Sequence, residues 1–102
     1  MDENAIPKIN EKISELTIDP ATLLLVDRTV AAQNNIIPIK FHAEDGTLDL
    51  ATWKESNFLD TNLLLRIIKD QATKVNKINL FLAEFDNMQD GFKTYYNQAI
   101  NN

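Results

Sequence analysis

Apolar side chains near the start of the chain recur at helical spacing. Ile9, Ile13 and Leu16 lie three to four positions apart, which would place them on one face of a helix. The polar residues between them would then face solvent. The pattern therefore predicts a short amphipathic helix over residues 8–16.

A second helical run follows a clear start signal. Asp19 can accept hydrogen bonds from free N–H groups of the first turn, and Pro20 suits the first helical position because its nitrogen carries no hydrogen. Apolar residues continue at helical spacing over residues 21–34. Asp27 could cap a second segment inside this run, so the pattern is compatible with one helix or with two short ones.

The middle of the chain has the pattern of a β-hairpin. Residues 36–42 are rich in β-branched and aromatic side chains, and Pro38 must lie at the start of this strand or on an edge because it cannot donate to a ladder. Asp45-Gly46 is the strongest turn signal in the chain. Residues 47–52 then alternate apolar and polar side chains, which predicts an antiparallel return strand.

The second half of the chain predicts a helix, a strand and a further helix. Residues 58–72 carry apolar side chains at helical spacing, with Ser56 or Asp60 able to cap the helix. Residues 74–82 alternate and predict a third strand. Asp86 is the expected cap of the last helix.

These elements define an α+β fold in the order α-α-β-β-α-β-α. We expect a small three-stranded sheet with helices packed mainly on one face, and a right-handed crossover between the second and third strands. The length of 102 residues fits a single domain over residues 1–102, with a core over about residues 8–97.

Composition and charge narrow the range of functions. The formal net charge of -5 disfavours nucleic-acid binding, which needs a basic face. The chain contains no cysteine, so disulfides and thiolate metal sites are excluded. Its first seven residues lack the apolar run of a signal peptide, and no apolar run approaches the length of a membrane span. We therefore expect a cytoplasmic protein without direct membrane insertion.

The acidic and histidine residues offer two candidate chemical sites. His42 could form a metal or acid–base site with nearby acids, which are Glu44, Asp45 and Asp49. An ordinary position in a hairpin strand explains it more simply. A second acidic group could bind a cation, but capping and the helix dipole account for it; its members are Glu84, Asp86 and Asp90. We predict no catalytic residue, metal ligand or cofactor, and no enzyme activity.

Aromatic residues are the better candidates for binding. Trp53 follows the second strand, where it is either a core residue beneath the long helix or an exposed anchor for a partner. Tyr95 and Tyr96 are adjacent on a helix and point in different directions, so we expect one to pack and one to expose its hydroxyl. The predicted partner-binding residues are Trp53, Lys54, Glu55 and Tyr96.

Four short motifs share their order and spacing with a known family. They are Ile18-Asp19-Pro20, Ile37-Pro38-Ile39, Leu48-Asp49-Leu50-Ala51-Thr52 and Tyr95-Tyr96. With them, residues 13–97 resemble the N-terminal domain of type II secretion and type IV pilus assembly ATPases, the general secretory pathway protein E family. The resemblance departs from the family pattern at residues 53–57, where an Asp-Pro pair is usual.

The resemblance implies a non-catalytic interaction module. Such a domain would dock a parent hexameric ATPase, or a related protein, to the cytoplasmic domain of an inner-membrane platform protein. The alternative is a sensor domain that binds a cyclic dinucleotide. Relatives that bind cyclic di-GMP do so through an Arg-Leu-Gly repeat, which this sequence lacks, and no phosphate-binding Walker motif can be written with only Gly46 and Gly91.

Overall fold

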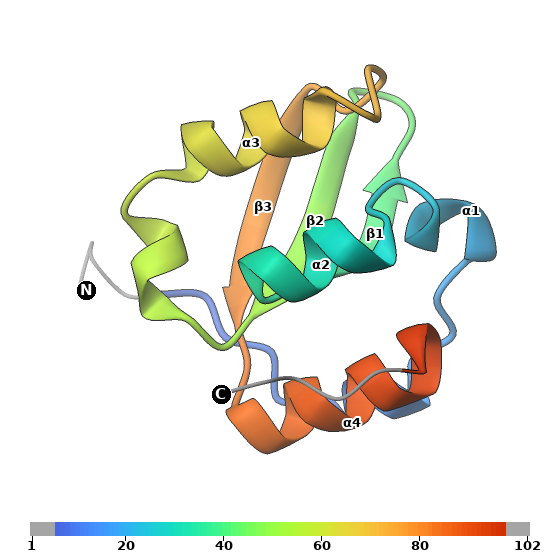
Figure 1. The fold of residues 1–102 in the computed structure, drawn as a ribbon, viewed down its shortest axis with the longest axis vertical. Helices are drawn as coiled ribbons and strands as arrows, with labels where there is room; N and C mark the ends of the chain where they lie inside the picture. Colours follow the sequence, from blue (N-terminus) through green and yellow to red (C-terminus); the bar gives the residue numbers. More distant parts are fainter. Residues whose placement is uncertain (1–5, 98–102) are drawn as a thin grey trace.

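The computed structural model describes residues 6–97 and confirms the α+β class (Figure 1). Its elements in chain order are η1 (Ile13–Glu15), α1 (Pro20–Leu23), α2 (Arg28–Asn34), β1 (Ile36–His42), β2 (Thr47–Thr52), η2 (Glu55–Phe58), α3 (Thr61–Lys69), β3 (Lys77–Leu82) and α4 (Phe85–Tyr96). The single-domain boundary expected over residues 1–102 includes residues 1–5 and 98–102, which lie outside the described residues. No helix within residues 6–97 has the length and apolar character that a membrane crossing requires.

The three strands form one sheet in the order β1-β2-β3. β1 and β2 are antiparallel, as the hairpin prediction required, and β2 and β3 are parallel and connected through η2 and α3. Gly46 closes the hairpin with a φ of 76°, a conformation that glycine adopts without strain. The Asp45 carboxylate accepts a 3.0 Å hydrogen bond from the Thr47 N–H and holds the turn.

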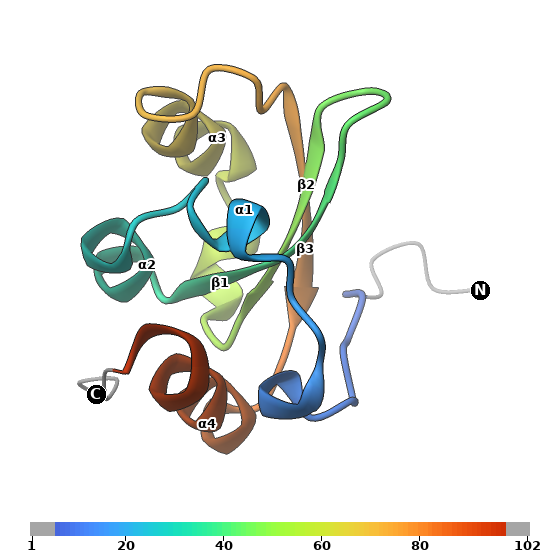
Figure 2. The same ribbon diagram turned by 90° about the vertical axis from the view of Figure 1, so that its right-hand side faces the viewer.

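α2 and α3 lie on one side of the sheet, and α4 lies across the end where β1 begins (Figures 1 and 2). The core between these layers is apolar and includes fully buried Ile36, Leu50, Ile68 and Phe92. Strand alternation turns the other set of side chains toward the opposite face, which α2 and α3 leave uncovered. That face carries a polar cluster with one residue from each strand, namely His42, Asp49 and Asn79.

Aspartate caps explain where the first three α-helices begin. The Asp19 carboxylate accepts from Ala21 N–H, and the Asp27 carboxylate accepts from the N–H groups of Thr29 and Val30. The run over residues 21–34 is therefore two short helices. Asp60, rather than Ser56, caps α3, which is shorter than the predicted helix over residues 58–72.

Two predictions about helices were wrong. Residues 8–16 do not form an amphipathic helix, because the Ile9 N–H donates to the Leu82 carbonyl at 2.9 Å and Lys8 pairs with Leu82 at the end of β3. Only the single turn η1 is helical there. Asp86 does not cap the last helix, which begins at Phe85 and has Glu84 at its N-cap without a side-chain hydrogen bond.

Candidate binding site

A surface pocket of about 650 Å³ forms where three distant parts of the chain meet. Trp53, Lys54 and Glu55 enter it from the end of β2 and the start of η2. Phe85 enters from the start of α4, and Lys8 from the segment that runs beside β3. The volume lies within the range of small-ligand pockets. We call this the Trp53 pocket.

An aromatic pair and a cation dominate the Trp53 pocket. The rings of Trp53 and Phe85 meet edge to face, with centroids 4.9 Å apart and an interplanar angle of 83°. The Lys54 ammonium lies 4.6 Å from the centroid of the Trp53 ring, a cation–π distance. Trp53 is half-buried. It therefore packs against Phe85 of α4 and forms a wall of the pocket.

The polar groups of the Trp53 pocket are suited to a ligand with both donors and acceptors. Lys8 and Lys54 supply positive charge, and Glu55 and Glu84 supply carboxylates. Glu84 leaves the first turn of α4 without a side-chain cap, so free N–H groups and the positive end of the helix dipole lie at the edge of the pocket. Within residues 6–97, the Trp53 Nε1 is a buried donor without a hydrogen-bond partner.

Three of the four predicted partner-binding residues meet in the pocket, and the fourth does not. Tyr96 is only 9% exposed, and its hydroxyl donates to the Val26 carbonyl at 2.9 Å. Burial raises the pKa of Tyr96 well above its ordinary value, and the charge of Asp27 adds to this effect. Tyr96 therefore does not line the Trp53 pocket, although it borders a separate groove between α1 and the end of α4.

Tyr95 also uses its hydroxyl internally. It donates to the Leu16 carbonyl, so both tyrosines tie α4 to earlier segments of the chain, and the expectation of one free hydroxyl was wrong. The sequence analysis identified neither Lys8 nor Phe85 as a pocket residue. No local signal marked Lys8, because its approach to the pocket depends on its bridge to Leu82 at the end of β3.

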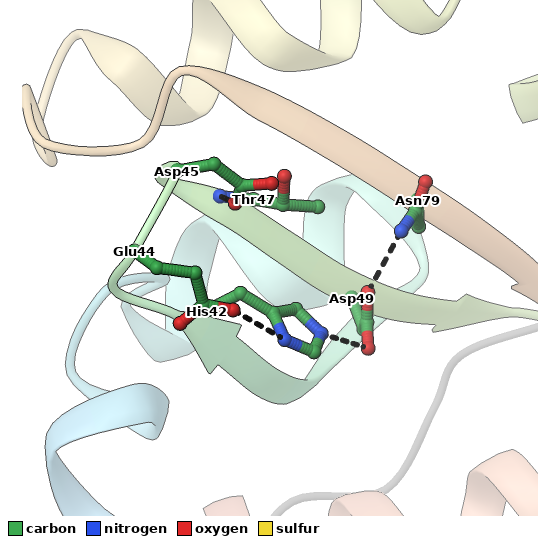
Figure 3. Close-up of polar contacts among 6 residues, drawn as sticks. All are labelled: His42, Glu44, Asp45, Thr47, Asp49 and Asn79. Carbon is green, nitrogen blue, oxygen red and sulfur yellow. Dashed lines mark hydrogen bonds and ion pairs between the residues drawn. The ribbon is translucent and has the colours of Figure 1, made fainter.

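His42 forms a second polar cluster on the sheet face that α2 and α3 leave uncovered (Figure 3). Its Nε2 lies 2.9 Å from the Asp49 Oδ2, and its Nδ1 lies 3.5 Å from the Glu44 Oε1. The Asn79 amide donates to the other Asp49 oxygen at 3.1 Å. The hydrogen bond to Asp49 raises the pKa of His42, and the charges of Asp49 and Glu44 add to this effect.

The His42 cluster joins all three strands and is suited to a structural role. Asp45 points into the turn, where hydrogen bonds from Thr47 lower the pKa of its carboxyl. Within the described residues, no group of three or more histidine, cysteine or acidic side chains is placed to hold a metal ion. The arrangement is that of a charged cross-strand contact, in which an imidazolium can bond two carboxylates.

Comparison with known proteins shows the fold. No protein-family model matches the chain, and no curated protein matches it. A solved structure described as MshE with cdg matches with a TM-score of 0.67 and 21% sequence identity. The match covers 89% of this chain but 59% of that one, so the chain spans less than two thirds of the protein to which it is similar. At this identity, the likeness establishes that the two share a fold.

Proposed function

We propose that this chain is a regulatory module that binds a cyclic dinucleotide in the Trp53 pocket. The fold likeness to MshE with cdg, which denotes cyclic di-GMP, is the observation that carries the proposal. MshE is an ATPase of the pilus and secretion family that the sequence motifs resemble. In this proposal the module works in the cytoplasm and performs no reaction on its ligand.

The chemistry of the Trp53 pocket supports a nucleotide ligand. A base can stack on Trp53 or Phe85, a contact worth about 1–3 kcal/mol per base in nucleic-acid complexes. Lys8, Lys54 and the uncapped start of α4 can bind a phosphate. The two lysines balance Glu55 and Glu84 locally, although the whole chain carries a net charge of -5.

The same carboxylates give a reason to expect guanine. Guanine presents adjacent N–H donors on its Watson–Crick edge, which a carboxylate can accept together, whereas adenine presents one donor beside an acceptor. Glu55 and Glu84 supply such acceptors at the pocket wall. Because the sequence lacks Arg-Leu-Gly, this mode differs from the repeat-based binding of the resembled relatives.

A thermal-shift titration tests the proposal. At a cyclic di-GMP concentration of about 100 Kd, binding to the folded state adds about 2.7 kcal/mol. For a domain of this size, that raises Tm by about 10 °C or more. Lys54→Ala should weaken binding, and Lys93→Ala, which removes the same charge from the exposed side of α4, should not. A flat titration, or equal affinity for the two variants, would reject binding at this pocket.

Docking to a protein is the second candidate, because a separate apolar groove is present. It lies between α1 and the end of α4, measures about 560 Å³ and includes Leu24 and Tyr95. The Leu24 side chain is 83% exposed and borders the groove, so a partner that binds there would bury it. The partner in this reading is the cytoplasmic domain of an inner-membrane platform protein, with a parent hexameric ATPase attached to this chain.

A binding titration distinguishes the two candidates. Leu24→Asp should abolish binding of the platform protein's cytoplasmic domain without changing the response to cyclic di-GMP. Ala43→Asp, which places the same charge in the exposed hairpin turn, is the control. If Leu24→Asp binds the platform domain as tightly as Ala43→Asp, the groove is not a docking site.

A further inference from the structure

The outer side of α3 carries apolar residues that the fold does not bury. Leu64 and Ile68 face the core, but Leu63 is 49% exposed and Ile67 is half-buried. Leu59, just before the helix, is 87% exposed. A helix that packs on a sheet needs only one apolar side. Figures 1 and 2 show α3 at the periphery of the fold, over one face of the sheet.

Two opposite charges flank this apolar strip. Asp60 precedes α3, and one oxygen of its carboxylate accepts from the Leu63 N–H at 3.0 Å. Arg66 lies about one helical turn further along, is exposed, and has no acidic partner among residues 6–97. Asp60 and Arg66 are thus equally spaced in sequence on either side of Leu63. This spacing makes the strip self-complementary when two copies meet with their α3 helices antiparallel.

We infer that the outer side of α3 is a docking surface for a second copy of this chain. In a two-fold arrangement with antiparallel α3 helices and Leu63 near the axis, Leu63 packs on Leu63 of the other copy. The position three residues after Leu63 then lies opposite the position three residues before it. Arg66 of each copy therefore meets Asp60 of the other, and Ile67 meets Leu59.

The reciprocal charges favour a second copy over an unrelated partner. A two-fold interface must place each surface against itself, and the strip meets this condition with both an apolar centre and two identical ion pairs. A surface one helix wide buries less than the roughly 800 Å² per partner of a standard complex. The dimer should therefore be weak and depend strongly on protein concentration.

Cysteine cross-linking tests the geometry directly, because the natural chain contains no cysteine. Leu63→Cys should form a disulfide-linked dimer under mild oxidation, since its two copies face each other at the axis. Leu24→Cys is a matched control, because Leu24 is exposed but lies on α1's side of the molecule. Equal cross-linking of the two variants would overturn the inference.

Sedimentation velocity over a range of concentrations provides the second test. Arg66→Glu replaces two attractions per dimer with two repulsions and should weaken dimerisation at least about tenfold. Arg28→Glu makes the same charge change on α2 and should have little effect. Asp60→Asn keeps an N-cap while removing the charge, and should weaken dimerisation severalfold. A protein that stays monomeric at all concentrations, or dimerises equally with Arg66→Glu, would refute the proposal.

Discussion

Replacing Tyr96 by phenylalanine should destabilise the fold without changing its shape. The substitution removes only the hydroxyl, which donates to the Val26 carbonyl across 70 positions of sequence. A typical hydrogen bond contributes about 1 kcal/mol, and leaving a buried acceptor unpaired costs about 1–3 kcal/mol. Val26 is 1% exposed, so water cannot readily replace the lost donor. We expect a loss of about 1–2 kcal/mol of unfolding free energy.

Urea denaturation measures this loss as a lower midpoint with an unchanged m-value. The corresponding fall in Tm is about 5–15 °C for a domain of this size. Tyr95→Phe is the matched control, because its ring is half-exposed and water can serve the Leu16 carbonyl. If Tyr96→Phe were neutral, or no worse than Tyr95→Phe, the assignment of Tyr96 to the core would be wrong.

Three further predictions concern the turn, the sheet face and α4. Gly46→Ala should cost about 2 kcal/mol in thermal unfolding, because the φ of 76° disfavours a Cβ and that atom would lie 2.9 Å from a backbone carbonyl. The pKa of His42 is raised in the fold, so its stabilising contribution is complete below about pH 6.5 and is lost as pH rises through the higher folded-state pKa. The stability difference between the natural chain and His42→Gln should shrink over that range, and a constant difference would contradict it. Gly91→Val should destabilise the fold by about 1–3 kcal/mol in urea, because even a Cβ would lie 2.8 and 2.9 Å from two isoleucine methyl groups.

Local chemistry explains why much of the fold could be predicted from the sequence. The Asp19, Asp27 and Asp60 caps act on N–H groups within three residues, so the signal and its effect lie side by side. The turn at Asp45-Gly46 is equally local. The alternation of apolar and polar residues along the strands then predicts which side chains face the helices.

The two wrong helix predictions concern segments in which contacts with residues distant in sequence override the local helical preference. Residues 8–16 have helical spacing, but the Leu82 N–H donates to the Pro7 carbonyl at 2.8 Å and draws the segment alongside β3. The start of α4 is set in part by Asn87, whose side chain accepts from the Ile13 N–H and donates to the Glu11 carbonyl. Neither partner can be identified from the sequence around the affected helix.

Only the part of the Trp53 pocket that is formed by consecutive residues could be predicted from the sequence. Trp53, Lys54 and Glu55 are consecutive, and their residue types indicated binding. Lys8 and Phe85 complete the pocket from opposite ends of the chain, and their approach depends on the sheet. The buried position of Tyr96 could not be predicted, because an amphipathic residue on a terminal helix has the same local pattern whether its hydroxyl faces water or a buried carbonyl.

The Trp53 pocket and the outer side of α3 are joined by one short segment. Glu55 lines the pocket and begins η2, and Leu59 follows the end of the same element. Asn57 holds this segment in place, since its amide donates to the Asn34 carbonyl and to the Thr52 hydroxyl, each at 2.9 Å. A ligand that moved Glu55 would therefore change the position of Leu59 at the proposed dimer surface.

Thermodynamic linkage makes this connection testable. If cyclic di-GMP changes the dimer dissociation constant by some factor, dimerisation must change the ligand affinity by the same factor. Sedimentation at saturating ligand and calorimetric titration at two protein concentrations measure the two sides independently. Asn57→Ala removes the hydrogen bonds that hold the connecting segment. The variant should still bind cyclic di-GMP and still dimerise, but each event should change the affinity of the other by a factor closer to one. An unchanged dimer constant at saturating ligand would mean that the two surfaces act separately, because a ligand can shift an equilibrium only through a difference in its affinity for the two states.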